Sequence, residues 1–355
     1  MRQSRKLDHL KYALLLKDGP VVTGFDDISL IHNCLPDISW ADIDVSTSVA
    51  GISLPHPVIL NAITGGGADV QPFNAQLAEF ARLSGSVMAV GSQFAALENP
   101  EVWHSYTIVN QVNPDGIVFA NLGAHATSEQ AKRAIDMIGA RAIQIHLNVA
   151  QEMFMPEGDR NFSGYLDNIA RIVREVDVPV IVKEIGCGIA KEQAYQIAMT
   201  GVNAIDVGGA GGTNFLAIEA ARSCTQLAPE TLHWGIPTAI SAIEVSSCLT
   251  PQNTDLIVSG GIRTPLEIVK SLSLGAAAVG MANPILRSLH SLGMEGTLEW
   301  FQLLLTDIKR FMLLMGAASI AQLSTVPLVI SGKTKEWLTS RNIDLTKYAT
   351  RGWHG

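Results

Sequence analysis

The stretch AIDVGGAGGTN (204–214) is a short apolar run that ends in a glycine-rich turn, and this pattern recurs along the chain. A strand followed by a helix, repeated eight times, is typical of a closed parallel barrel. We therefore predict an α/β protein with the (β/α)8 TIM-barrel fold. The other seven runs are PVILNAITGGG (57–67), SVMAVGSQ (86–93), GIVFANLGA (116–124), RAIQIHLNVAQE (141–152), PVIVKEIG (179–186), DLIVSGGIR (255–263) and AAVGMANP (277–284).

Helix-like sequence separates most of these runs. We expect one barrel domain at 57–355, which includes C-terminal helices. Residues 1–56 precede the first barrel strand, and we expect an N-terminal extension that caps the barrel and contributes to substrate binding. The predicted helices lie near 5–17, 71–84, 127–138, 163–175, 191–200, 215–222, 238–248, 265–274 and 295–316.

The composition narrows the class of protein. The chain has 355 residues, 47% of them hydrophobic, which is ample for a large core, and its net charge of −8 argues against nucleic acid as a partner. The four cysteines are widely spaced and follow no pattern of a metal or redox site. No segment predicts a signal peptide or a membrane span, so we expect a soluble, cytoplasmic protein without a membrane partner.

Three glycine-rich turns follow the last three predicted strands. They are GGAGGTN (208–214), SGGIR (259–263) and GMANP (280–284). Glycine lets the backbone approach an anion closely, and the N-terminus of the following helix supplies N–H groups and a partial positive charge. These glycines could also serve only sharp turns, but three such loops together favour a phosphate site.

Lys183 lies at the end of an apolar strand, in VIVKEIG. Burying a lysine is costly unless an anion meets it. It could pair with Glu184 or another carboxylate, or it could contact an electron-rich cofactor ring or a substrate oxyanion. Thr64, Ser92 and Asn121 end three other strands and add hydroxyl and amide groups to the same rim.

The segment HLNVAQE (146–152) gathers four polar side chains at the end of one strand. His146 and Asn148 face the same side because they are two residues apart, and Gln151 and Glu152 follow in what we expect to be a loop. Glu152 could bind a hard divalent ion if a diphosphate supplied the other oxygens, or it could pair with a basic residue. For His146 alone, a satisfied core histidine would be the simpler interpretation.

The N-terminus opens with basic residues. Arg5, Lys6 and His9 would share one face of a helix. They could form a solvated basic end, or an arm that covers an anionic substrate.

At these residues the chain resembles type 2 isopentenyl-diphosphate delta-isomerase, the FMN-dependent class, over essentially its whole length. The motif set HLNVAQE (146–152) with MPEGDR (155–160) is specific to that resemblance, whereas the glycine loops also occur in other FMN barrels. Further shared motifs are RKLDH (5–9), AITGG (62–66), GSQ (91–93), ANLG (120–123), VKE (182–184), GGTNF (211–215) and SGGIRTP (259–265).

The resemblance implies FMN at the barrel mouth, Mg²⁺ on the substrate diphosphate through Glu152, and NADPH as the reductant of FMN. It implies that reduced FMN acts as acid and base, with Gln151, His146 and Lys183 in catalytic roles. The implied FMN-binding residues are Ala62, Ile63, Thr64, Ser92, Asn121, Lys183, Thr213, Gly260, Gly261, Ile262, Arg263, Met281 and Ala282. The implied substrate-binding residues are Arg5, Lys6, His9, Ser92, Gln93, Phe94, His146, Asn148 and Gln151.

Two positions depart from the family pattern. Phe94 stands where an arginine often follows SQ, and this puts one diphosphate contact in doubt. Gly208 stands where a serine often follows DV, which suggests a contact to the flavin phosphate through the backbone alone.

Two other functions stay open at this point. The barrel and its glycine loops would also suit an FMN enzyme of net redox chemistry, such as a 2-hydroxyacid oxidase, or a flavin-binding barrel without catalysis. The basic arm has no clear purpose for a small acid, and the HLNVAQE set speaks against a non-catalytic barrel. We expect the protein to act on a small diphosphate as a homo-oligomer, a tetramer or octamer.

Overall fold

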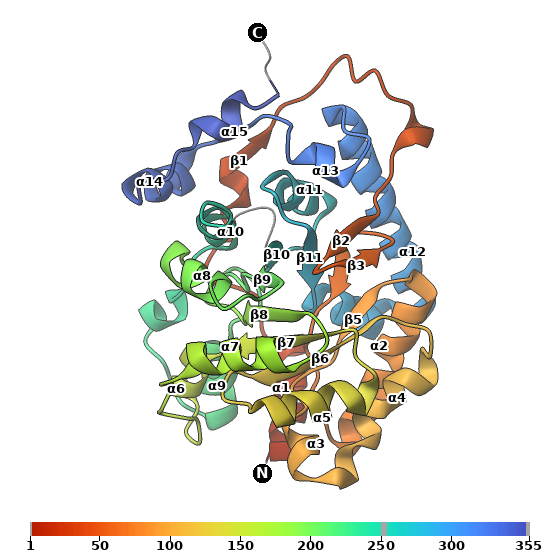
Figure 1. The fold of residues 1–355 in the computed structure, drawn as a ribbon, viewed down its shortest axis with the longest axis vertical. Helices are drawn as coiled ribbons and strands as arrows, with labels where there is room; N and C mark the ends of the chain where they lie inside the picture. The colour runs from red at the N-terminus through yellow and green to blue at the C-terminus, as the bar shows by residue number, and fades with distance from the viewer. Residues whose placement is uncertain (1, 250–253, 353–355) are drawn as a thin grey trace.

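The structure is a computed structural model that describes residues 2–249 and 254–352, with side chains from residue 7 onward. Eight parallel strands close into a barrel in chain order, which confirms the predicted fold (Figure 1). Each strand lies within one of the eight predicted runs. The strands are β4 (Val58–Leu60), β5 (Val87–Ala89), β6 (Val118–Gly123), β7 (Ala142–Leu147), β8 (Val180–Glu184), β9 (Ala204–Asp206), β10 (Asp255–Ser259) and β11 (Ala278–Met281).

Most barrel strands are followed by a predicted helix, and these helices begin and end within two residues of their expected bounds. The agreement is closest for α2 because Pro72 fits its first turn and Gly85, at φ 73°, ends it. The matching helices are α2 (Gln71–Ser84), α5 (Ser128–Ile138), α7 (Tyr165–Glu175), α8 (Lys191–Ala198), α9 (Phe215–Ser223), α10 (Thr238–Ser246) and α11 (Pro265–Ser273).

Several shorter helices were not predicted. α3 (Phe94–Glu98) and α4 (His104–Val112) lie between β5 and β6, and α6 (Val149–Phe154) follows β7 directly. The last of these corrects one expectation, because Gln151 and Glu152 lie on a helix rather than in a loop.

The predicted helix 295–316 is the second half of a longer element. α12 runs from Asn283 to Met315 and is interrupted at Gly293, whose φ of 69° and ψ of −173° are not helical. Pro284 fits the first turn of this helix. The first half therefore begins directly after β11, at the barrel mouth.

Residues before β4 reach both ends of the barrel. The hairpin of β2 (Thr47–Val49) and β3 (Ile52–Leu54) packs its apolar side chains against Phe119 and Ile257 inside the barrel. The backbone N–H of Ala50 donates to the carboxylate of Asp255, at the start of β10, so the hairpin closes the amino end.

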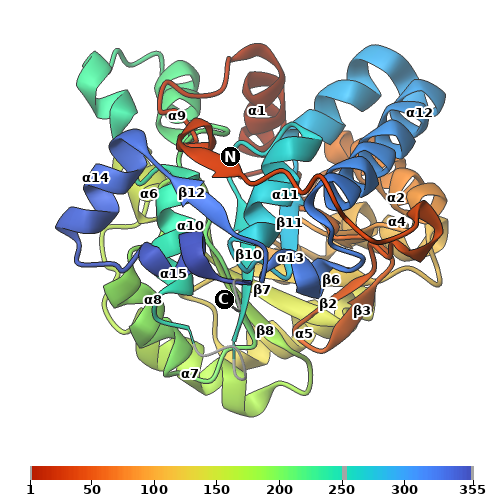
Figure 2. The same ribbon diagram turned by 90° about the horizontal axis from the view of Figure 1, so that it is seen from above.

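Helix α1 (Arg2–Leu15) lies at the opposite, carboxyl end, beside α9 (Figure 2). The segment after it is tied to the barrel by Asp18, which accepts from Arg263 at 2.8 Å and pairs with Arg287 at 3.3 Å. Arg287 also donates to the carbonyl of Leu16 at 2.6 Å. These contacts fix the end of α1 against the start of α12.

The C-terminal segment packs, together with β1 (Ile28–Leu30), against the outer helices α10 and α11 on the side of the barrel. Arg341 and Trp337 donate to the buried carboxylate of Glu244 on α10, at 3.0 and 2.8 Å. This ion pair anchors the segment to the barrel wall. Its elements are α13 (Ile320–Leu323), β12 (Leu328–Ile330), which pairs with β1, α14 (Gly332–Ser340) and α15 (Thr346–Thr350).

The apolar core is continuous between the barrel strands and the outer helices. Phe301 of α12 is fully buried, and its ring meets Phe80 of α2 edge-on at 5.3 Å and His56 at 5.2 Å. In the described part of the chain, none of the helices has the length and hydropathy that crossing a bilayer requires.

Replacing Phe301 with alanine should destabilise the fold by about 3–5 kcal/mol, because it leaves a cavity between α12 and α2. Gln302→Ala on the same helix is the matched control, since that side chain is exposed. Denaturant unfolding of both variants measures the difference. Equal stability of the two variants would contradict the packing described for α12.

Candidate active site

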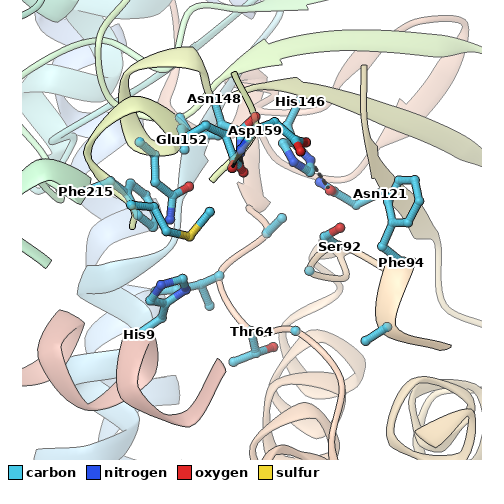
Figure 3. A pocket seen from close by; sticks show the side chains of 18 of the residues that line it. His9, Thr64, Ser92, Phe94, Asn121, His146, Asn148, Glu152, Asp159 and Phe215 are labelled. Atoms are coloured by element: carbon cyan, nitrogen blue, oxygen red, sulfur yellow. Dashed lines mark hydrogen bonds between the residues drawn. The ribbon is translucent and has the colours of Figure 1, made fainter. Parts of the chain in front are cut away.

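A cavity of about 600 Å³ opens at the carboxyl ends of the barrel strands, and a narrower one of about 110 Å³ adjoins it. The two share Ala62, Ile63, Lys183 and Phe215 in their walls. Figure 3 shows the larger cavity with its polar side chains directed inward from α1, β6 and β7. Predicted residues that line one or both cavities are His9, Ala62, Ile63, Thr64, Ser92, Phe94, Asn121, His146, Asn148, Gln151, Glu152, Lys183, Thr213, Gly260, Gly261, Ile262, Arg263, Met281 and Ala282.

The glycine loops after β9 and β10 form one wall of the narrower cavity. Their backbones touch, because a Cβ on Gly260 would lie 2.1 Å from the carbonyl oxygen of Gly209. A Cβ on Gly261 would lie 2.4 Å from the oxygen of Gly211. Gly260 and Gly261 also have φ of 107° and 85°, which L side chains rarely adopt. Side chains are therefore excluded from this wall, as a phosphate cradle requires.

The N-terminus of α12 opens on the same cavity. Ala282, Asn283 and Pro284 line it, and no side chain of residue 282 caps the helix. Uncapped N–H groups and the helix dipole favour an anion at this position. The glycine wall and this helix end together fit the phosphate of a mononucleotide cofactor.

Lys183 lies in the wall between the two cavities and is only 5% exposed. Its Nζ donates to the carbonyl oxygen of Glu184 at 2.8 Å and forms no ion pair with a carboxylate of the described residues. The carboxylate of Glu184 instead accepts the N–H groups of residues 185–187. The expected alternative, a Lys183–Glu184 ion pair, is therefore wrong, and the ammonium is placed to meet an anionic ring or oxygen.

Burial raises the pKa of the Glu184 carboxyl to about 7, although the three N–H groups and Lys183 act in the opposite direction. This carboxyl lines the narrower cavity. A titratable group therefore lies directly beside Lys183.

Helix α6 presents two neighbouring side chains to different partners. The carboxylate of Glu152 accepts from Asn148 at 2.7 Å and from the backbone N–H of Asp159 at 2.9 Å. Arg160 bonds the carbonyl of Glu152, and no basic side chain of the described residues pairs with the carboxylate. The described residues contain no group of three His, Cys, Asp or Glu side chains that could hold a metal ion by themselves. Glu152 therefore fits an ion that takes its other ligands from substrate and water.

The amide of Gln151 is held by Glu219 of α9, a residue that the sequence analysis did not single out. Glu219 accepts from Gln151 Nε2 at 2.7 Å and bonds His9 Nε2 of α1 at 2.8 Å. Arg222 donates to its other oxygen at 2.8 Å. One buried carboxylate thus joins α1, α6 and α9 behind the side chains of His9, Gln151 and Arg222, which line the larger cavity.

The hydrogen bonds to Glu219 control its charge. Burial by itself would raise the pKa of the Glu219 carboxyl, but the hydrogen bonds from His9, Gln151 and Arg222 lower it to about 2. The Glu219 carboxyl is therefore ionised at neutral pH and is paired with the guanidinium of Arg222.

His146 and Asn121 line the opposite wall and are hydrogen-bonded to each other at 2.8 Å, as the dashed line in Figure 3 shows. The ring of Phe94 lies at the same wall and stacks on His125, with 4.3 Å between ring centroids and 23° between planes. His125 also lines the cavity and was not predicted. Position 94 thus contributes an aromatic surface backed by an imidazole.

One predicted substrate contact is wrong. Gln93 is fully buried, and its side chain points away from the cavity: Nε2 donates to the carbonyl of Ala134 and Oε1 accepts from the N–H of Asn121. Its neighbours Ser92 and Phe94 face the cavity, so the turn directs successive side chains in different directions.

Three basic residues were also predicted to contact the cofactor or the substrate. The guanidinium of Arg263 is engaged by Asp18 and by the carbonyls of Gly261 and Gly211, so its side chain braces the glycine loops. The side chains of Arg5 and Lys6 lie outside the described part of the structure.

Three comparisons place this chain among known proteins. Residues 127–329 match the family of FMN-dependent dehydrogenases. Proteins named isopentenyl-diphosphate delta-isomerase are similar over 99% of the chain: 45% identical in Symbiobacterium thermophilum, 47% in a Geobacillus species and 49% in Bacillus cereus. The chain covers 99–100% of the length of each.

Solved structures share the fold at low sequence identity. A flavocytochrome b2 variant with pyruvate bound aligns with a TM-score of 0.68 at 18% identity, over 95% of this chain and 85% of that one. A mandelate oxidase variant aligns with a TM-score of 0.64 at 18% identity, over 91% and 92%. These likenesses support the barrel architecture alone.

Glu219→Gln should remove stability in a pH-dependent way. A carboxyl whose pKa is lowered from 4.5 to about 2 stabilises the folded state above pH 4.5, and this contribution is lost as the pH falls toward 2. The difference in unfolding free energy between native protein and variant should therefore be largest near neutral pH and shrink below pH 4.5.

Denaturant titrations between neutral and acidic pH measure this difference. Glu336→Gln, at an exposed position of α14, is the control and should change stability by about 0.5 kcal/mol or less throughout. A Glu219→Gln difference that stays constant with pH would contradict the charge state described here.

Proposed function

The chain belongs to the family of isopentenyl-diphosphate delta-isomerases, and from this premise we propose that it interconverts isopentenyl diphosphate and dimethylallyl diphosphate. The observation that carries the proposal is the arrangement across one cavity. Gln151, whose amide is held by Glu219, lines it on one side, His146 lines it on the other, and Lys183 and the glycine wall adjoin it. This arrangement suits proton movement beside a bound flavin.

The residues of the narrower cavity, together with the part of the larger one lined by Thr64, Ser92 and Asn121, would hold FMN. The glycine loops at 208–212 and 260–261 and the N-terminus of α12 would bind its phosphate, and Lys183 would meet its ring. When bound and reduced, FMN supplies an electron-rich ring and a proton donor and acceptor. The sequence has no nucleotide-binding motif of its own for NADPH, which would reduce the flavin by transient contact.

The rest of the larger cavity would hold the substrate. Glu152 would bind Mg²⁺, which would bridge to the diphosphate, while His9, Asn148 and the basic residues Arg5 and Lys6 of α1 would bind the phosphate oxygens. Fixing the diphosphate positions the alkene for proton transfer.

Moving the double bond requires protonation at one carbon and proton loss from another. An alkene carbon is a weak base, so the cationic transition state needs stabilisation in a site shielded from water. The ionised Glu219 accepts from the amide of Gln151 at 2.7 Å and holds that side chain in place beside the cavity. Gln151 and His146 would assist the proton transfers.

We also propose that the protein is a cytoplasmic homo-oligomer, a tetramer or octamer. The apolar side chains of Leu303 and Leu314 on α12 are 61% and 46% exposed, and contact between outer helices of two copies would cover them.

An anaerobic proton NMR assay tests the function directly. The FMN-loaded protein is incubated with isopentenyl diphosphate, Mg²⁺ and excess NADPH. Dimethylallyl diphosphate should form without matching NADPH consumption. Product formed with equimolar NADPH oxidation would indicate net redox chemistry, and the absence of product would indicate a barrel without this activity.

Gln151→Ala should lower turnover by about 10²–10⁴-fold, because the amide that faces the substrate alkene is lost. FMN binding should persist, since Gln151 does not line the narrower cavity, where the glycine wall and the N-terminus of α12 would bind the FMN phosphate. The NMR assay measures turnover, and flavin absorbance measures cofactor content. Near-normal turnover would remove Gln151 from the mechanism.

Glu152→Gln should raise the Mg²⁺ concentration needed for half-maximal activity on the order of tenfold or more, because an anionic ligand is replaced by a neutral one. Asp159→Asn is the matched control, since Asp159 lines the same mouth and keeps its backbone N–H to Glu152. An unchanged Mg²⁺ requirement in Glu152→Gln, or an equal rise in the control, would contradict a specific ligand role.

A further inference from the structure

A chain of buried side-chain hydrogen bonds crosses the barrel beneath the cavity. It begins at His146 Nδ1, which lies 2.8 Å from Asn121 Oδ1. Asn121 Nδ2 donates to Gln144 Oε1 at 3.0 Å, and Gln144 Nε2 donates to Asn61 Oδ1 at 3.0 Å. Asn61 Nδ2 then donates to Asp206 Oδ2 at 2.7 Å. Four strands or strand ends, β7, β6, β4 and β9, are linked in this way.

Asp206, at the far end of this series of hydrogen bonds, decides which group donates and which accepts at every step. A carboxylate can only accept hydrogen bonds, so Asn61 must turn its NH₂ group toward Asp206. Its oxygen is then left to accept from Gln144, whose oxygen in turn accepts from Asn121. The oxygen of Asn121 therefore faces His146, and Nδ1 of that ring must carry the proton.

The surroundings of Asp206 hold it in the accepting role. Its other oxygen, Oδ1, accepts from the hydroxyl of Ser259 at 2.5 Å and from the backbone N–H of Gly208 at 3.2 Å. The backbone N–H of Ala62 also donates to Asn61 Oδ1 at 3.0 Å and supports the same amide orientation. Asp206 is fully buried and Gln144 is 1% exposed, so water does not compete for these groups.

We propose that Asp206 is a positioning residue that fixes the neutral tautomer of His146, with the proton on Nδ1, through Asn61, Gln144 and Asn121. His146 then gains and loses its second proton only at Nε2. A Cβ on Gly123 would lie 3.2 Å from this Nε2 and 2.8 Å from Cε1 of His125, so Nε2 is on the side where His125 lines the cavity.

The assignment of the His146 tautomer does not depend on the proposed function. The use of that tautomer in the reaction rests on the proposed function. In the proposed isomerase, a ring fixed in this way exchanges its proton toward the cavity and never toward the barrel interior. The carboxylate that imposes this choice lies across the barrel from the histidine and touches neither the substrate nor His146.

The test is ¹⁵N NMR of the FMN-loaded protein with labelled histidine at alkaline pH. Ring nitrogens with and without a proton differ in chemical shift, and a His146→Gln sample identifies the signals of His146. In the native protein only the Nδ1–H form should be present. In Asp206→Asn, the amide at position 206 can donate as well as accept. The hydrogen bonds then have no fixed donor-to-acceptor order, and both tautomers of His146 should be populated.

Ser259→Ala is the matched control. It removes one hydrogen bond from the same carboxylate but leaves the acceptor for Asn61, so the Nδ1–H form should persist. A rescue variant combines Asp206→Asn with Gln144→Glu. The carboxylate at position 144 accepts directly from Asn121 and should restore the Nδ1–H form.

If Asp206→Asn does not fold, Gln144→Leu provides the second perturbation, because it cuts the chain next to Asn121. Circular dichroism and flavin content verify that each variant is folded. A folded Asp206→Asn or Gln144→Leu protein that shows only the Nδ1–H form would overturn the proposal, as would an Nε2–H form in the native protein. Neither result would bear on whether the enzyme isomerises its diphosphate.

Discussion

Parallel closure of the barrel is the constraint on which the rest of the structure depends. Because all eight strands run in one direction, their carboxyl ends meet at a single mouth. The polar groups that end the strands are then buried together and must satisfy one another. Asn61, Asn121, Gln144 and Asp206 do so by bonding across the interior. The same convergence places Lys183 in the wall between the two cavities at this mouth.

The sequence predicted the barrel well because each strand is a local feature, a short apolar run bounded by turn residues. Helices with a clear start and stop, such as α2, were also predicted well. α12 was predicted to begin too late because Gly293 interrupts its pattern, and α6 was missed because six residues are too few for a periodic signal. Both of these helices, α6 and α12, border the cavity.

The site was predicted in part, and its gaps have one physical origin. Residues named at strand ends reached the cavity, because closure brings strand ends together. Glu219 was missed because it lies on a helix far along the chain from Gln151, and no spacing links the two. Gln93 was assigned to the substrate because its neighbours face the cavity, but a tight turn sends its side chain toward α5. Orientation within a turn depends on tertiary packing, which a linear pattern does not encode.

The position of α1 has a practical consequence for handling the protein. Its His9 contacts Glu219 at the cavity wall, so the first residues of the chain run beside the mouth. A bulky fusion partner or a solid support attached at that terminus would crowd the entrance that a substrate must use. The last described helix, α15, lies at the side of the molecule opposite to α1 in Figure 1. Attachment on that side would leave the entrance open for surface-based binding measurements.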